Sequence, residues 1–158
     1  MKRRAARRQG FTLIEVLLVI AIIGLLAGVF IFAIGGEQEK AQKDTTALLV
    51  KQVCGALDRY KLAIGRYPTE EDGGLDALRV QPTFDDDALQ DKWAGPYLTS
   101  EPKDAWNNAL GYEVTEAGTD EAKTVPYKVW SYGPNGQDDN GADDDIRNKA
   151  WADSEEMD

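Results

Sequence analysis

Apolar residues form a long unbroken run near the start of the chain. From Val16 to Ile34, nineteen consecutive residues carry no charge, and most of them are apolar. At ~1.5 Å per residue a helix of this length spans roughly 28 Å, close to the hydrocarbon thickness of a lipid bilayer. The run therefore predicts a membrane-inserted helix within residues 11–36.

After Gly36 polar residues dominate, and apolar residues return with a helical period. They are spaced by four, three, four and four residues: Leu49, Val53, Ala56, Tyr60 and Ile64. This spacing places them on one face of an amphipathic helix. Gly65 is a typical C-terminal cap, and Pro68 opposes continuation of the helix. We expect one helix from about Thr12 to Ile64, whose second half needs a packing partner.

Residues 66–134 are rich in Gly, Pro and Asn turn signals. Two short stretches with β-branched and aromatic residues, Leu110–Val114 and Tyr127–Tyr132, are predicted to pair as strands. A small antiparallel sheet packed on the helix gives an α+β fold with a folded domain over residues 37–146. Its core is expected to use these aromatic residues: Trp93, Tyr97, Trp106, Tyr112, Tyr127 and Trp130. Residues 147–158 are predicted to form a polar tail.

Charge is distributed unevenly along the chain. The net charge is −10, yet residues 1–10 contain five basic residues and no acid. Basic residues flanking a membrane helix stay in the cytoplasm, so the acidic domain is expected on the other side. The acidic domain also argues against nucleic acid as a partner.

An ordinary secretory signal peptide is the alternative for the N-terminal segment. Its apolar region is normally 7–15 residues long and is followed by small residues at the cleavage site. Ala33-Ile34-Gly35 offers such a site, but the apolar run here is longer than that range.

The residue types argue against catalysis. The chain has no His, one Cys (Cys54) and three Ser, so neither an activated nucleophile nor a cysteine-based metal cluster is predicted. We expect no enzyme activity, and we expect Cys54 to be a packed residue on the helix.

Glu15 is the one charge in the apolar segment. A carboxylate at membrane depth costs about 2–4 kcal/mol unless it is paired or neutralised. If the chain is cut after Gly10, Phe11 carries a free amine one helical turn from Glu15. The carboxylate then pairs with this amine in its own chain or in a neighbouring copy. A carboxylate that is protonated or reaches the interface is the alternative.

The residues from Gly10 to Glu15, with the sequence GFTLIE after a basic leader, closely resemble the processing signal of type IV pilins and pseudopilins. The resemblance implies that a prepilin peptidase cleaves after Gly10 and removes residues 1–10. It also implies N-methylation of Phe11 and a role for Glu15 in subunit assembly.

A narrower resemblance covers residues 8–147. Its segments follow in order: Gly65-Arg66-Tyr67-Pro68-Thr69, Gly74-Leu75, Ala77-Leu78, Trp93-Ala94-Gly95-Pro96-Tyr97-Leu98 and Pro102-Lys103-Asp104-Ala105-Trp106-Asn107-Asn108. They resemble the major pseudopilins of the type II secretion system. The resemblance implies a structural subunit that is anchored in the inner membrane, with its C-terminal domain in the periplasm. There it polymerises into a filament that drives export of folded proteins.

The same resemblance implies a set of partners. These are other copies of the chain, minor pseudopilins, the prepilin peptidase, the membrane platform and motor ATPase, and lipid before assembly. The alternative is a type IV pilin of a surface fibre for adhesion, motility or DNA uptake. Many such pilins carry a C-terminal disulfide loop, which one Cys cannot form.

Residues 131–146, SYGPNGQDDNGADDDI, concentrate oxygen ligands between glycines. Calcium takes six to eight oxygens, which a flexible Gly/Asp loop can supply, although the spacing is not that of an EF-hand. A solvated acidic turn is the alternative. The pseudopilin resemblance favours a structural calcium ion, with Asn135 where the family has Asp. The candidate ligands are the Tyr132 carbonyl, Asn135, Asp143, Asp144 and Asp145.

Overall fold

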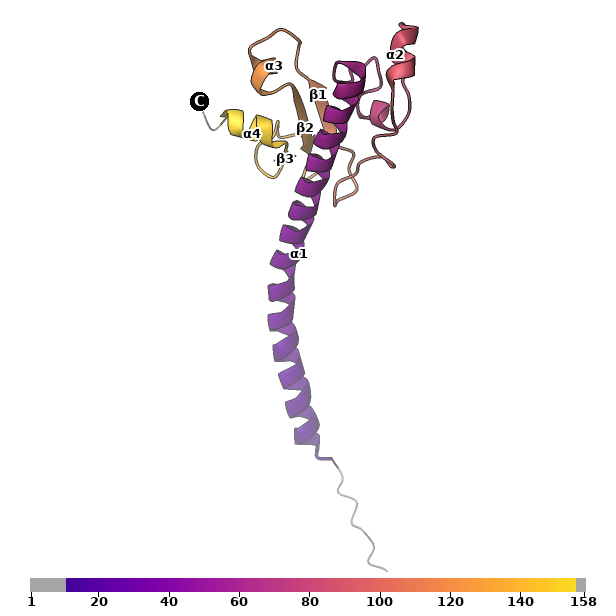
Figure 1. The fold of residues 1–158 in the computed structure, drawn as a ribbon. Coiled ribbons are helices and arrows are strands. Elements are labelled where there is room, and N and C mark those ends of the chain that lie inside the picture. The colour runs from indigo at the N-terminus through magenta and orange to yellow at the C-terminus, as the bar shows by residue number, and fades with distance from the viewer. Residues whose placement is uncertain (1–10, 156–158) are drawn as a thin grey trace, which may run out of the picture. The chain divides into compact units, whose positions relative to one another are not determined.

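A computed structural model describes residues 11–155, with the side chains of residues 29–35 outside that description (Figure 1). Helix α1 runs over Leu13–Ile64. Thr12 caps its start, because its hydroxyl oxygen accepts a 3.3 Å hydrogen bond from the backbone N–H of Glu15. At the other end Gly65 has φ +95°, and its N–H donates to the Lys61 carbonyl. The predicted helix is therefore confirmed at both ends.

The chain divides into two compact units between Lys40 and Ala41. In the first unit every side chain from Phe11 to Gly28 is exposed. Over the part of the chain that the structure describes, no helix is both long and apolar enough to cross a membrane. The predicted membrane segment, residues 11–36, includes residues 29–35, whose side chains lie outside the described part.

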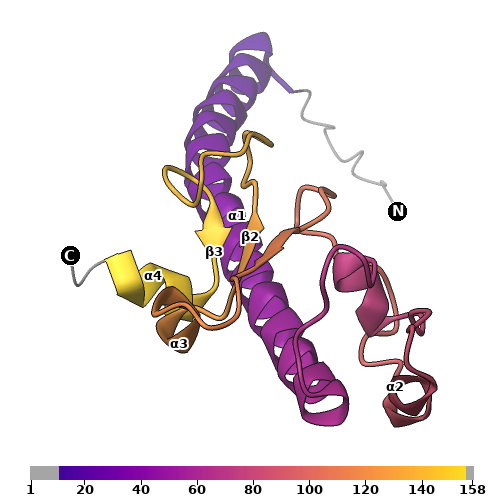
Figure 2. The ribbon, with the colours of Figure 1, turned by 90° about the horizontal axis from the view of Figure 1, so that it is seen from above.

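The second unit contains a three-stranded antiparallel sheet in the order β1-β2-β3 (Figure 2). The strands are β1 Gly111–Val114, β2 Tyr127–Ser131 and β3 Ile146–Arg147. Gly111 pairs with Trp130, and Ser131 pairs with Ile146. The predicted pairing of the first two strands is confirmed, and β3 is an element that the sequence pattern did not indicate.

The core lies between the sheet and the C-terminal part of α1. Val53, Leu57 and Tyr60 are fully buried on the helix, and Val129 is fully buried on β2. Tyr127 is buried beside them, while Trp93, Tyr97 and Tyr112 are partly buried against the same cluster. Cys54 also packs there, and burial raises the pKa of its thiol. The predicted helix face and the packed Cys54 are confirmed.

Short helical segments fill the connections. They are the 3-10 helix η1 Gly74–Leu78 and the α-helices α2 Asp87–Lys92, α3 Glu121–Thr124 and α4 Lys149–Glu155. Asp86 caps α2 by accepting a 2.9 Å bond from the N–H of Ala88. Each of these segments is too short to be stable by itself, so packing on the core must hold it.

A buried carboxylate ties the 103–109 segment to the sheet and to α1. Asp104 is 6% exposed and accepts bonds from the N–H groups of Trp106 and Asn108 and, at 2.6 Å, from the hydroxyl of Ser131. Next to it, the N–H of Ala105 donates to the buried hydroxyl of Thr46 on α1. Because these donors satisfy its oxygens, the Asp104 side chain is tolerated in the interior.

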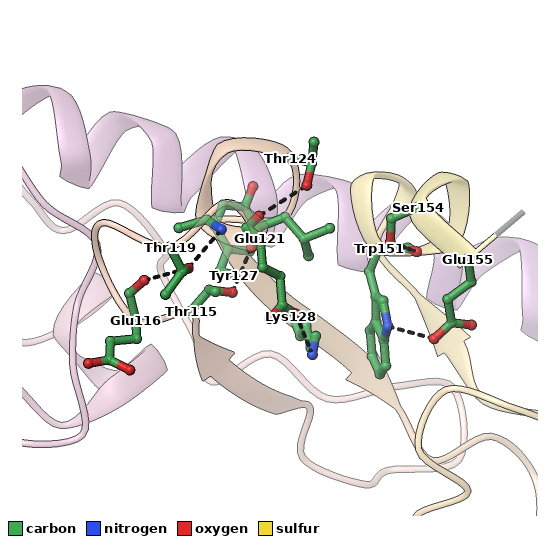
Figure 3. Close-up of polar contacts among 12 residues, drawn as sticks. Thr115, Glu116, Thr119, Glu121, Thr124, Tyr127, Lys128, Trp151, Ser154 and Glu155 are labelled. Atoms are coloured by element: carbon green, nitrogen blue, oxygen red, sulfur yellow. Dashed lines mark hydrogen bonds and ion pairs between the residues drawn. The ribbon is translucent and has the colours of Figure 1, made fainter. Parts of the chain in front are cut away.

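The prediction of a polar tail over residues 147–158 is wrong for residues 147–155. Residues 149–155 form α4, and Trp151 is only 8% exposed. Its indole packs edge-on against Trp130 with ring centroids 5.8 Å apart, and its Nε1–H donates to Glu155 (Figure 3). The prediction failed because it rested on the polar composition of the segment. One residue, Trp151, packs on Trp130 of β2 and holds the segment against the sheet.

Candidate functional site: the processing motif and the acidic loop

The processing motif lies at the start of α1. Gly10 is outside the described residues, and Phe11 is 84% exposed. Glu15 is exposed in the first turn, three residues after the Thr12 cap. A carboxylate in the first turn interacts favourably with the helix dipole. Phe11 and Glu15 are therefore both accessible to a second molecule.

The acidic loop connects β2 to β3 and depends on glycine for its path. Gly133 has φ +60°, and a Cβ there would overlap the carbonyl oxygen of Asp144. Gly141 has φ +79°, and a Cβ there would lie 2.7 Å from the Trp151 indole. No larger residue fits either position, so the loop is closed tightly on itself and on α4.

Asn135 is the centre of the loop. Its side-chain amide nitrogen donates to Asp139 at 2.8 Å and to Asp144 at 2.6 Å. Its backbone N–H donates to the other oxygen of Asp144 at 3.0 Å, and its amide oxygen accepts a bond from the N–H of Gln137. One amide group thus joins two carboxylates that would otherwise repel each other.

Asp145 holds the second half of the loop. Its Oδ2 accepts the N–H groups of Asp139 at 3.0 Å and Gly141 at 2.9 Å. Its Oδ1 is buried and has no hydrogen-bond partner among the described residues. Burial raises the pKa of Asp145, and the charges of Asp139 and Asp138 add to this, while the two N–H donors oppose it. A cation near Oδ1 would relieve this cost.

The predicted ligands divide into two groups. Asn135 and Asp144 are in direct contact, and Asp145 lies in the same loop with an unpaired oxygen. Asp143 is exposed with φ +48°, and the Tyr132 carbonyl accepts the N–H of Gly136 at 3.1 Å. Within residues 11–155, no three acidic or cysteine side chains are grouped as a metal cluster.

The donor set of the loop nevertheless suits a hard cation. Asn135 places its NH₂ group between Asp139 and Asp144, where a positive charge would also be favoured. Rotation of the amide by half a turn exchanges its nitrogen for its oxygen and presents an acceptor instead. Together with the unpaired Oδ1 of Asp145, this gives oxygen ligands of the kind that Ca²⁺ prefers.

The contribution of Asp139 was missed in the sequence. It stands four residues after Asn135 and is one of five aspartates between residues 138 and 145, and only the folded loop brings its carboxylate to the amide. The contact of Gly141 with Trp151 was also missed, because α4 itself was not expected. Arg147 links β3 to α4, because its guanidinium pairs with Glu155 and lies 5.7 Å from the centre of the Trp151 ring.

Comparison with protein families gives two matches. Residues 33–149 match the family model of the type II secretion system protein G. Residues 5–35 match the model of the prokaryotic N-terminal methylation motif. The second match includes Gly10, Phe11 and Glu15.

Individual relatives agree with these matches. The chain is 37% identical to the type II secretion system core protein G of Dickeya chrysanthemi, over 90% of this chain and 86% of that protein. It is equally similar to the protein of the same name from Aeromonas hydrophila, over 92% of that protein. The crystal structure of the major pseudopilin of enterohaemorrhagic Escherichia coli matches with a TM-score of 0.52 and 26% identity, covering 72% of this chain and 90% of that one. The resemblance found in the sequence is thereby confirmed, and the chain belongs to the protein G family of the type II secretion system.

Proposed function

We propose that this chain is a structural subunit of the type II secretion pseudopilus, which polymerises in the periplasm to drive export of folded proteins across the outer membrane. The observation that carries the proposal is the family match over residues 33–149. The exposed apolar surface of residues 11–28 supports it, because such a surface requires lipid or protein contacts. The chain has a structural role in this proposal and performs no chemistry.

The alternative, a type IV pilin of a surface fibre, is less well supported. Both relatives described above are named core protein G, and the matching crystal structure is that of a major pseudopilin. The shared methylation motif does not distinguish the two classes, so the match over the folded domain decides.

We infer that processing and membrane insertion precede assembly. A prepilin peptidase cleaves after Gly10, Phe11 is N-methylated, and the apolar half of α1 anchors the subunit in the inner membrane with its folded domain in the periplasm. Glu15 then pairs with the amine of Phe11 in a neighbouring copy. The methylation-motif match over residues 5–35 supports the processing step, and the exposure of Phe11 and Glu15 leaves both groups accessible for the pairing.

Secretion by the native host tests the function. Deletion of the gene is expected to abolish export of the type II substrates, and the wild-type chain is expected to restore it. Glu15→Leu is expected to give a stable membrane protein that does not restore export. Unchanged export in the deletion strain would overturn the proposal.

Mass spectrometry tests the processing step. The mature chain is expected to begin with N-methylated Phe11, and Gly10→Val is expected to retain the leader. Gln9→Ala is the matched control and should be cleaved normally. A mature N-terminus elsewhere would exclude this processing site.

The remaining partners follow from the family. Minor pseudopilins, the inner-membrane platform and the motor ATPase are expected to contact the assembled filament. Each is a proposal that in vivo crosslinking of the full chain tests.

We also propose that the acidic loop holds a structural Ca²⁺ ion. Asn135, Asp144 and Asp145 would hold it, with Asp143 and the Tyr132 carbonyl as further candidate oxygens. The support is the unpaired buried oxygen of Asp145 and the close approach of the Asp139 and Asp144 carboxylates to one amide. The ion would remove the repulsion between carboxylates and fix the loop against α4.

Thermal unfolding of the full chain in detergent, with excess Ca²⁺ or with chelator, tests this site. Native-state binding at 100 times Kd adds ~2.7 kcal/mol, so Tm is expected to rise with Ca²⁺. Asp144→Ala should remove the shift, whereas Asp138→Ala, at an exposed position of the same loop, should retain it. Equal Tm values with Ca²⁺ and with chelator would exclude a structural calcium.

A further inference from the structure

Two Asn-Gly pairs lie in the acidic loop, at Asn135-Gly136 and at Asn140-Gly141. An asparagine that precedes glycine is chemically labile, because no side chain hinders attack of the glycine nitrogen on the asparagine amide. The product of this attack is a cyclic succinimide. The two pairs are equivalent in sequence and both asparagines are exposed, but the structure holds their side chains differently.

The side chain of Asn135 is fixed in place. Its nitrogen donates to two carboxylates, and its oxygen accepts the N–H of Gln137 at 2.6 Å. The N–H of Gly136, whose nitrogen would attack, donates to the carbonyl of Tyr132 at 3.1 Å. The amide of Asn135 must therefore break three hydrogen bonds before its carbon can reach the glycine nitrogen.

The side chain of Asn140 is not fixed. In the part of the chain that the structure describes, its amide makes no hydrogen bond, and the residue contacts Asp138 through its backbone N–H at 3.0 Å. The N–H of Gly141 donates to Oδ2 of Asp145 at 2.9 Å. A carboxylate that accepts an N–H bond makes the nitrogen more nucleophilic than a neutral carbonyl does.

The fold requires the glycine of this second pair. Gly141 has φ +79°, and a Cβ there would lie 2.7 Å from the Trp151 indole. The amide of Asn140, in contrast, supports no contact within the described residues. Packing therefore maintains the reactive pair through its glycine, while its asparagine remains free to react.

We propose that Asn140 is a site of spontaneous deamidation and isoaspartate formation in the folded chain. The nitrogen of Gly141 bonds to Cγ of Asn140, and the Cγ–Nδ2 bond breaks. The amide group leaves as ammonia with the proton that the glycine nitrogen loses, and a succinimide remains. Water then opens the ring without any oxidation or reduction. Opening at Cγ gives aspartate at position 140, and opening at the main-chain carbonyl gives isoaspartate.

Isoaspartate at position 140 alters the support of Asp145. The N–H groups of Asp139 and Gly141, on either side of Asn140, donate to the same oxygen of Asp145 at 3.0 and 2.9 Å. Isoaspartate places one additional carbon in the main chain between these two donors, so they cannot both keep their geometry on one oxygen. Aspartate leaves the main chain unchanged. Isoaspartate thus loosens the loop, whether or not the chain forms a filament.

Incubation of the full chain in detergent at mildly alkaline pH tests the assignment. The tryptic peptide 129–147 contains both asparagines, so fragmentation mass spectrometry measures the two conversions in one sample. In the folded chain Asn140 is expected to convert at least about tenfold faster than Asn135, because three hydrogen bonds hold the latter. In urea the two are expected to convert at similar rates, because neither side chain is then held.

Selective conversion of Asn140 in the folded chain, lost in urea, supports the proposal. Equal or faster conversion of Asn135 in the folded chain would overturn it. A folded chain in which neither site reacts, while both react in urea, would overturn it as well. The same preference in urea would place its cause in the neighbouring sequence, and the structural assignment would then fail.

The stability of the incubated chain tests the consequence. The Tm of the wild type is expected to fall by at least about 2 °C as isoaspartate accumulates. Asn140→Gly is the matched control, because glycine adopts the positive φ of this position and has no amide to react. Its Tm should not change on incubation. An unchanged Tm of wild-type chain rich in isoaspartate would exclude the loosening of the loop.

Discussion

The two halves of α1 belong to one helix, but they differ in how far their apolar side chains are buried within the chain. From Leu13 to Gly28 all side chains are exposed, whereas Val53, Leu57 and Tyr60 in the second half are completely buried. The buried half is complete within one chain, because the sheet and the 66–110 segment cover its apolar face. The exposed half has no such cover in the described structure.

The difference teaches that helical conformation and burial are separate properties. The N-terminal half is apolar on every side, so no surface of a small domain can cover it. The C-terminal half has one apolar face, which a single layer of strands and loops covers. Mutations should therefore affect folding at one end and assembly at the other.

The largest expected effect comes from Leu57. Leu57→Ala leaves a cavity in the core and is expected to destabilise the folded domain by about 3 kcal/mol. Leu25→Ala, at a residue that is 72% exposed, should change the unfolding free energy by less than about 0.5 kcal/mol. Denaturant unfolding of the full chain in detergent measures both. Equal losses would mean that the two halves of α1 are not distinct.

Trp151 extends the comparison to the C-terminus. The segment around it, α4, is polar in composition, yet its one large apolar side chain is buried within the chain. Trp151→Ala removes the contacts with Trp130 and Gly141 and is expected to cost about 2 kcal/mol. Lys149→Ala, which removes only a surface ion pair with Asp153, should cost about 0–0.5 kcal/mol. Thermal unfolding measures the pair, and a neutral Trp151→Ala would show that α4 does not support the loop.

Asn135 extends the comparison to polar groups, because its amide gives two neighbouring carboxylates a hydrogen-bond donor within the chain. Asn135→Asp replaces the bridging amide by a third carboxylate, so without Ca²⁺ the variant is expected to lose about 1–2 kcal/mol. Added Ca²⁺ should reverse this loss and give a larger Tm shift than in the wild type. Asn140→Asp, at another exposed position of the same loop, is the control and should behave as the wild type does. An unchanged Tm for Asn135→Asp in chelator would contradict the bridging role.

The smallest effect concerns pH. Burial opposes ionisation of Asp72, but Arg66 and the N–H and hydroxyl of Thr69 outweigh it and lower its pKa. Ionised Asp72 therefore adds stability above its unfolded-state pKa, and this contribution is lost as the pH falls through the lowered pKa.

Asp72→Asn is expected to cost less than about 1 kcal/mol at pH 7 and to flatten the loss of stability below about pH 4. Urea unfolding at a series of pH values measures this, with Asp76→Asn, an exposed carboxylate, as the control. Identical pH profiles for the wild type and Asp72→Asn would contradict the assignment.

Much of the fold could be predicted from the local pattern of apolar and polar residues. The spacing of Val53, Ala56, Tyr60 and Ile64 fixed the buried face of α1, and Gly65 fixed its end. Alternation in residues 127–131 fixed the pairing with residues 111–114. These signals are local, because helical and strand periodicities depend on neighbouring residues in the chain.

The candidate site was predicted less completely. The acidic loop was located, and of the predicted residues Asn135 donates to Asp144, while Asp145 accepts the N–H groups of Asp139 and Gly141. The choice of Asp139 over Asp143 as the partner of the amide depends on the path of a glycine-rich loop. A run of similar carboxylates carries no periodicity from which that path can be derived.

The sequence by itself determined the family, the long helix, the pairing of β1 with β2 and the position of the acidic loop. Only the tertiary structure decided that residues 149–155 form a helix, that Asp104 joins the loop before β1 to Ser131, and that Asn135 bridges two carboxylates. The reason is the range of the interactions. Periodicity and capping act over a few residues, whereas Trp151 on Trp130 and Ser131 on Asp104 join residues more than twenty positions apart, which only folding brings together.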